Sequence, residues 1–143
     1  MLSPAVDLIN EVRLLYNRLV EIVEELHSDT GITAPQRAVL EYLHHNGAAT
    51  VPAMARARNV TRQHIQTIIN DLHESRLVSP EPNPAHQRSP LFTLTDAGSA
   101  TIGAIVSRES EYLKARLGDV AEEDVRAATR TLTTLRHRLG EQP

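Results

Sequence analysis

The sequence has no cysteine and no tryptophan, and aromatic residues make up only 3% of its 143 positions. Without cysteine the chain has no disulfide bond, thiolate nucleophile, thiol redox switch or cysteine-ligated metal site. With one Phe and three Tyr, the core must consist of Leu, Val, Ile and Ala, which suits helices better than a β-sandwich. The contents of hydrophobic residues (41%) and charged residues (23%) are ordinary for a globular domain of this length.

Long apolar runs are also missing. No run approaches the length of a membrane span, and Asp7 and Glu11 occupy the segment where a secretory signal would be apolar. We therefore expect a cytoplasmic protein without a membrane partner.

Carboxylates are absent from two stretches of a chain that holds 18 of them. One comprises the 29 residues between Glu41 and Asp71, and the other runs from Pro82 to Thr95. The net charge of the chain is −3, yet residues 30–90 carry six arginines and only four acids. This distribution marks the middle of the chain as a candidate site for a polyanion.

Capping residues and apolar periodicity predict six helices. Ser3 and Pro4 begin the first, Thr33 and Gln36 form a capping-box pair, and Asn59 provides a tight turn. The predicted helices cover residues 4–27, 34–46, 51–58, 62–74, 96–117 and 121–139.

Two short extended runs, Leu77-Val78 and Leu91–Leu94, flank a proline-stiffened loop and predict a β-hairpin. Helix, tight turn, helix and hairpin follow one another in the order of a winged helix-turn-helix. The predicted fold is therefore mainly α with a small β-hairpin wing.

The predicted helix over residues 62–74 has two different faces. At roughly 100° per residue, its isoleucines and Leu72 fall on one side, and the polar side chains fall on the other. Over residues 62–70 the polar side has neither Lys nor Glu, which a merely solvated face usually carries. Arg, Gln and Asn make bidentate hydrogen bonds to guanine or adenine edges in the major groove. The polar side consists of Arg62, Gln63, Gln66, Thr67 and Asn70.

Three segments, Thr50–Gln66, Asn83–Leu91 and the Leu-Thr-x-x-Gly element Leu94–Gly98, resemble the MarR family of bacterial transcriptional regulators. The resemblance covers nearly the whole chain and implies a homodimer that binds double-stranded DNA, with a pseudo-palindromic operator and a repressor function. It implies a single domain over residues 1–143. Residues 31–98 would form the DNA-binding lobe, and residues 1–30 and 99–143 the dimerisation helices.

The resemblance also places a recognition helix in the major groove and the wing in the minor groove. Arg88 matches the family's minor-groove arginine, but His86 stands where an acidic residue is common, and Arg76 where glycine is frequent. Arg58 either reaches a phosphate or is simply solvated. The candidate DNA-binding residues are Thr50, Thr61, Arg62, Gln63, Gln66, Thr67, Asn70, His86 and Arg88.

Relatives in this family often bind small aromatic acids or lipophilic molecules, which implies a possible small-molecule effector. From helical faces alone, the candidate lining of an effector site is Leu15, Tyr16, Leu19, Leu40 and His44.

Other activities lack a supporting pattern. The adjacent pair His44-His45 points in directions about 100° apart on a helix, which disfavours chelation of one ion, and no H-E-x-x-H spacing occurs. There is no glycine-rich phosphate loop and no G-x-S-x-G motif, so we expect no metal, no cofactor and no enzyme activity. The alternative to a DNA-binding regulator is a helical interaction module that retains the fold without binding specific DNA.

Overall fold

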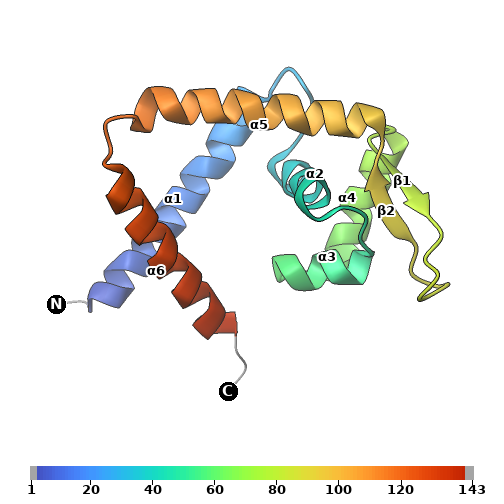
Figure 1. Cartoon of the computed structure of the whole chain (residues 1–143), viewed down its shortest axis with the longest axis horizontal. Helices are drawn as coiled ribbons and strands as arrows, with labels where there is room; N and C mark the ends of the chain where they lie inside the picture. Colours follow the sequence, from blue (N-terminus) through green and yellow to red (C-terminus); the bar gives the residue numbers. More distant parts are fainter. Residues whose placement is uncertain (1–2, 141–143) are drawn as a thin grey trace. The chain divides into compact units, whose positions relative to one another are not determined.

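The computed structural model of the chain describes residues 3–140 and confirms a mainly α fold with one antiparallel hairpin (Figure 1). Residues up to Glu109 form one compact unit, and residues from Ser110 form a second. In chain order the elements are α1 (Pro4–Leu26), α2 (Ala34–Asn46), α3 (Val51–Arg58), α4 (Arg62–Glu74), β1 (Val78–Glu81), β2 (Leu91–Leu94), α5 (Asp96–Leu117) and α6 (Glu122–Gly140).

The predicted caps begin the helices. The Ser3 hydroxyl accepts a hydrogen bond from the backbone N–H of Val6 at 3.4 Å, and Pro4 occupies the first turn of α1. At α2, Thr33 and Gln36 form the complete capping box, each side chain accepting from the other's backbone N–H. These bonds satisfy N–H groups that lack a partner within the helix.

The turn between α3 and α4 depends on Asn59, which has a φ of 54° and lies in the left-handed region. Asparagine tolerates this backbone conformation better than most residues do. The next N–H, that of Val60, donates to the Ala55 carbonyl at 3.0 Å. The turn ends α3 and allows α4 to begin after Thr61.

The first strand of the hairpin is shifted from the predicted Leu77-Val78: Leu77 lies outside it, and β1 begins at Val78 and continues through Pro80 to Glu81. Val78 pairs with Leu94 and Pro80 with Phe92 in an antiparallel register. Ala49 adds an isolated bridge: its N–H donates to the Phe92 carbonyl at 3.1 Å, and the Phe92 N–H donates to its carbonyl at 2.8 Å. The bridge connects the segment before α3 to the base of the wing.

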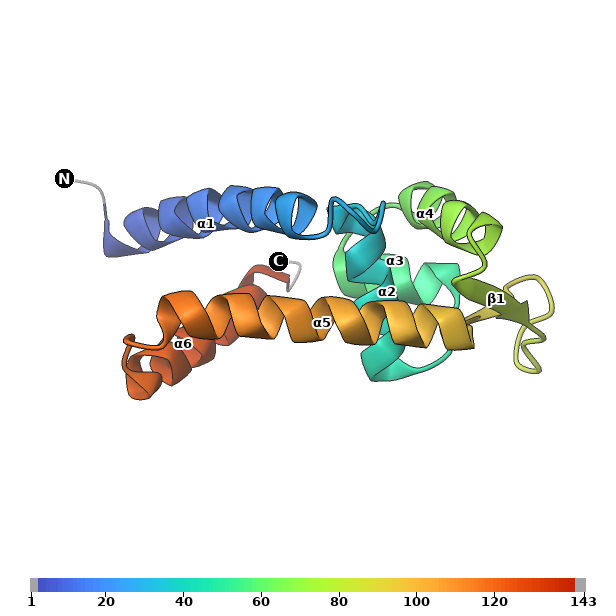
Figure 2. The ribbon, with the colours of Figure 1, turned by 90° about the horizontal axis from the view of Figure 1, so that it is seen from above.

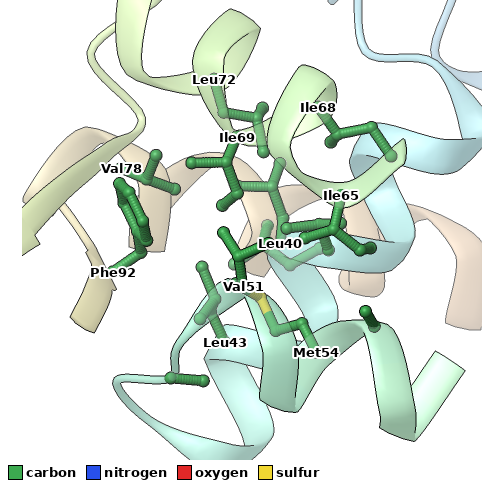
Figure 3. Close-up of a cluster of buried hydrophobic side chains, with 14 of the residues drawn as sticks. Leu40, Leu43, Val51, Met54, Ile65, Ile68, Ile69, Leu72, Val78 and Phe92 are labelled. Atoms are coloured by element: carbon green, nitrogen blue, oxygen red, sulfur yellow. The ribbon is translucent and has the colours of Figure 1, made fainter. Parts of the chain in front are cut away.

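The hydrophobic core lies between α2, α3, α4, the hairpin and α5. Figure 3 shows isoleucines of α4 facing Leu40 of α2, with Met54 of α3 below and Phe92 of β2 beside Val78. Leu40, Met54 and Ile69 are completely buried. Ile102 and Ile105 of α5 also belong to this core, which therefore extends beyond residue 98.

A close approach of backbones joins the wing to α5. Gly98 is buried, and a Cβ at this position would overlap the Leu77 carbonyl oxygen. Thr95 caps α5 by accepting from the Gly98 N–H at 3.0 Å, and its hydroxyl donates to the Arg76 carbonyl at 2.7 Å. Arg76 itself has a positive φ of 61°. The Leu-Thr-x-x-Gly element thus has two roles. Its threonine caps the N-terminus of α5, and its glycine, which has no side chain, lets the Leu77 carbonyl approach the helix closely.

Helix α1 extends away from α2, α3 and α4 and has no buried residue (Figure 2). Its apolar side chains are largely open to solvent in the single chain, among them Leu14, Leu15 and Tyr16. Helix α6, taken by itself, also has no buried residue, and its acidic first turn (Glu122, Glu123, Asp124) complements the positive end of the helix dipole.

Candidate nucleic-acid interface

The polar face of α4 is exposed, as the sequence predicted. Its opposite face is buried, with Ile65 at 2%, Ile69 at 0% and Leu72 at 1% exposure. The apolar face holds α4 in the core and so determines which side chains point outward. The exposed side chains include all five polar candidates, Arg62, Gln63, Gln66, Thr67 and Asn70.

Hydrogen bonds organise part of this face. The Gln66 side chain donates from Nε2 to Oδ1 of Asn70 at 2.8 Å. The Thr67 hydroxyl donates at 3.0 Å to the backbone carbonyl of Gln63, one turn earlier in the helix, so it has no proton left for a second partner. Within residues 3–140, no hydrogen bond or ion pair engages the Arg62 guanidinium. Its five N–H donors are therefore available to an acceptor from outside the chain.

Thr50 and Thr61 are the N-caps of α3 and α4. Their hydroxyl oxygens accept from the backbone N–H groups of Ala53 at 3.2 Å and His64 at 3.1 Å. Each hydroxyl keeps its own proton, which can be donated to a phosphate oxygen.

The loop between β1 and β2 (Figure 1) contains His86 and Arg88 in its sequence, and both side chains are exposed. The Asn83 side chain shapes this loop: its Nδ2 donates to the Ser89 carbonyl at 2.9 Å, and its Oδ1 accepts from the Ala85 N–H at 3.2 Å. In the described part of the chain, Arg88 forms no ion pair. Its charge is therefore not neutralised by a carboxylate nearby.

The candidates for an effector site are in different surroundings. Leu15, Tyr16 and Leu19 are exposed by 55%, 65% and 41% on α1, and His44 is exposed on α2. Leu40, in contrast, is completely buried in the core, where a ligand in solution cannot reach it.

A separate groove of about 730 Å³ contains none of these candidates. It lies between the segment after α1, the end of α4 and α5, with Leu72, Leu77, Ile105, Thr101 and Arg108 in its wall.

Sequence reasoning missed a cluster of charged side chains at the junction of three elements. His27, completely buried after α1, lies with Nε2 3.1 Å from Oε1 of Glu109 on α5, and Glu109 also binds Arg37 of α2. Arg37 additionally contacts Glu41. Only the chain's folding brings together residues that lie in three separate helical segments, so no local sequence pattern identifies the cluster.

Within residues 3–140, no group of three or more His, Asp or Glu side chains lies close enough to hold a metal ion. No helix in the same range is both long and apolar enough to span a membrane.

Comparison with known sequences shows which family the middle of the chain resembles. The model of the MarR family matches residues 30–89, which contain α2, α3, α4 and the first part of the wing. An uncharacterized protein from Mycobacterium tuberculosis is 40% identical over 83 residues, which make up 58% of this chain and 57% of that relative. The match thus spans little more than half of the relative's length.

Comparison with solved structures extends the similarity over nearly the whole chain. The MarR family transcription regulator SP03579 superposes with a TM-score of 0.83 at 27% identity, covering 94% of this chain and 89% of that one. A mutant MarR from E. coli, solved in complex with operator DNA, has a TM-score of 0.79 at 19% identity and covers 92% and 94% of the two chains. The chain therefore has the winged-helix fold of MarR family proteins, and over residues 30–89 its sequence is similar to the model of that family.

Proposed function

We propose that the protein is a transcriptional regulator that binds a specific DNA site as a homodimer. The observation that carries this proposal is the exposed polar face of α4 over residues 62–70, which combines Arg, Gln, Thr and Asn side chains without Lys or Glu. Such a face can form directed hydrogen bonds to base edges, whereas Lys-rich surfaces bind phosphates with little sequence preference.

In this proposal α4 enters the major groove. Arg62, Gln63 and Gln66 lie in its first turns and contact base edges, and Thr67 and Asn70 continue the same face. The hydroxyls of Thr50 and Thr61 donate to phosphates, and Arg88 of the wing enters the minor groove, with His86 beside it. The complex of the structurally similar E. coli MarR with operator DNA supports this use of the fold.

A second copy of the chain is the proposed partner of the exposed apolar side chains of α1. Leu15 and Leu19 are exposed by 55% and 41% in the single chain, and covering such a stripe removes apolar surface from water. A two-fold symmetric dimer requires a pseudo-palindromic site with half-site centres about 10 bp apart.

The protein is further proposed to act as a repressor that a small molecule releases from DNA. Leu15, Tyr16, Leu19 and His44 remain the proposed contacts of this effector, without the buried Leu40. Thermal-shift measurements with small phenolic and acyl compounds test this part, because a ligand of the folded state raises the apparent melting temperature.

The DNA-binding proposal is tested by fluorescence anisotropy with DNA from upstream of the protein's own gene and with a scrambled duplex, each at two salt concentrations. Tight binding to the upstream DNA is expected, and Arg62→Ala should weaken it by on the order of 1–3 kcal/mol. Arg138→Ala, which removes the same charge from exposed α6, is the matched control and should bind normally. A folded wild-type protein that binds neither duplex at low salt would instead favour an interaction module without DNA binding.

A further inference from the structure

The hydrogen bond between Gln66 and Asn70 has a consequence for base recognition that depends on the proposed DNA binding. Both residues lie on the exposed face of α4, one turn apart, and Gln66 Nε2 donates to Asn70 Oδ1 at 2.8 Å. The direction of this bond determines which hydrogen-bonding groups each carboxamide can still offer to DNA.

A glutamine carboxamide has two N–H donors and one acceptor oxygen. Asn70 takes one N–H of Gln66, and among residues 3–140 no other hydrogen bond engages this side chain. Gln66 therefore retains Oε1 and one N–H on the same carboxamide group. In the major groove, adenine offers the complementary pair, a donor at N6 and an acceptor at N7, whereas guanine offers two acceptors.

We propose that Gln66, held in place by Asn70, selects an adenine in each half of the DNA site. Oε1 of Gln66 accepts from adenine N6, and its remaining N–H donates to N7. Asn70 is a positioning residue: it reduces the number of conformations of the long Gln66 side chain before DNA binds. Because an immobilised side chain loses less freedom on binding, this arrangement strengthens the contact.

The geometry of α4 supports the choice of Gln66 over its neighbours. Ile65 and Ile69, which directly precede Gln66 and Asn70 in the sequence, are 2% and 0% exposed and anchor this part of the helix in the core. Thr67 has its hydroxyl proton bound to the Gln63 carbonyl, so it cannot donate to a base. Arg62 has only donors and suits guanine rather than adenine.

The experiment is selection of binding sites from a random duplex library, with the base preference at each position determined by sequencing. For the wild type, one position in each half-site should prefer adenine by about 5- to 150-fold. Gln66→Glu keeps the length of the side chain but has only acceptors, so the same position should change its preference to cytosine, whose N4 amino group is a donor.

Substitutions at Asn70 distinguish positioning from direct contact. Asn70→Ala should reduce the adenine preference at the Gln66 position by about 2- to 12-fold. Asn70→Asp retains an oxygen that accepts from Gln66, so it should keep the adenine preference while its added negative charge lowers affinity for all duplexes. Both positions are exposed, and circular dichroism melting should give wild-type transitions for all three variants.

The outcomes separate this proposal from the proposed function. If Gln66→Glu binds DNA with an unchanged preference at every position, Gln66 does not select a base, although DNA binding itself stands. If Asn70→Ala leaves the adenine preference intact, the positioning role is wrong. If the wild type binds no duplex from the library, the proposed function fails and this assignment fails with it.

Discussion

Arg37 of α2 and Glu109 of α5, 72 residues apart in sequence, form a bidentate ion pair. The guanidinium donates from Nε to Oε1 at 2.8 Å and from Nη2 to Oε2 at 2.6 Å. Burial by itself would raise the pKa of Glu109, but the hydrogen bonds and charge of Arg37, assisted by His27, outweigh it and hold the pKa below its ordinary value. The ion pair therefore connects α2 to α5.

Removing the charge of Glu109 should destabilise the fold. Glu109→Gln removes one of the two carboxylates that pair with the partly buried Arg37 and leaves it only Glu41, so we expect a loss of about 1–3 kcal/mol in the free energy of unfolding. Urea denaturation at a fixed protein concentration measures this change in the free energy of unfolding. The control is Glu122→Gln, which breaks the exposed pair with Arg126 on α6 and should cost less than about 1 kcal/mol. Equal losses in the two variants would contradict a special role for the Arg37–Glu109 pair.

The same pair predicts a pH dependence in the acid range. Because the pKa of Glu109 is lower in the folded chain than its ordinary value of 4.5, its contribution is complete above that pH and is lost as the pH falls through the folded pKa. The stability difference between wild type and Glu109→Gln should therefore be largest near neutral pH and shrink below about pH 4.5. A difference that stays constant from pH 7 to pH 3 would show that the carboxylate contributes nothing by its charge.

Gly98 should not tolerate a side chain. Gly98→Ala places a Cβ against the Leu77 carbonyl oxygen, and separating α5 from the wing should cost on the order of 3 kcal/mol. Gly103→Ala in the same helix meets no atom within 4 Å, so it should be neutral or stabilise by about 0.5–1 kcal/mol. Thermal melting of the two variants compares them directly, and similar melting temperatures would contradict the close approach.

A charge on the exposed stripe of α1 should prevent dimerisation. Leu15 is exposed in the single chain, so Leu15→Asp should leave the fold intact but bury an unpaired carboxylate in a dimer, at a cost of about 2 kcal/mol or more. Asn17→Asp, exposed on the opposite face of α1, introduces the same charge and should dimerise normally. Sedimentation equilibrium measures both, and a Leu15→Asp dimer of unchanged affinity would place this side chain outside the interface.

Loss of the wing arginine should change the salt dependence of DNA binding. Arg88→Ala should weaken binding to most sequences, and the slope of log K against log salt should become shallower by about one unit. The control is Arg138→Ala, which removes a positive charge from α6 instead of from the wing. Anisotropy titrations at four salt concentrations give the slope, and a slope identical to that of the wild type would place Arg88 away from the DNA.

Local signals in the sequence were sufficient to predict the helices and the two faces of α4. The Thr33–Gln36 capping box and the left-handed Asn59 depend on hydrogen bonds and backbone preferences within a few residues, and both formed as predicted. The hairpin was predicted less completely. Its first strand extends through Pro80 because β2 pairs with it, and two short segments do not reveal their pairing register by composition alone.

The sequence by itself determined the order of elements, the polar face of α4 and the proline-stiffened loop that carries Arg88, because periodicity, caps and turn residues act over short distances. Only the tertiary structure decided that Leu40 is buried, that Arg37 pairs with Glu109, and that Gly98 is required beside the Leu77 carbonyl. Each of these depends on segments distant in sequence meeting at van der Waals or hydrogen-bond distance. Such contacts are set by how several helices pack together, which no single segment encodes.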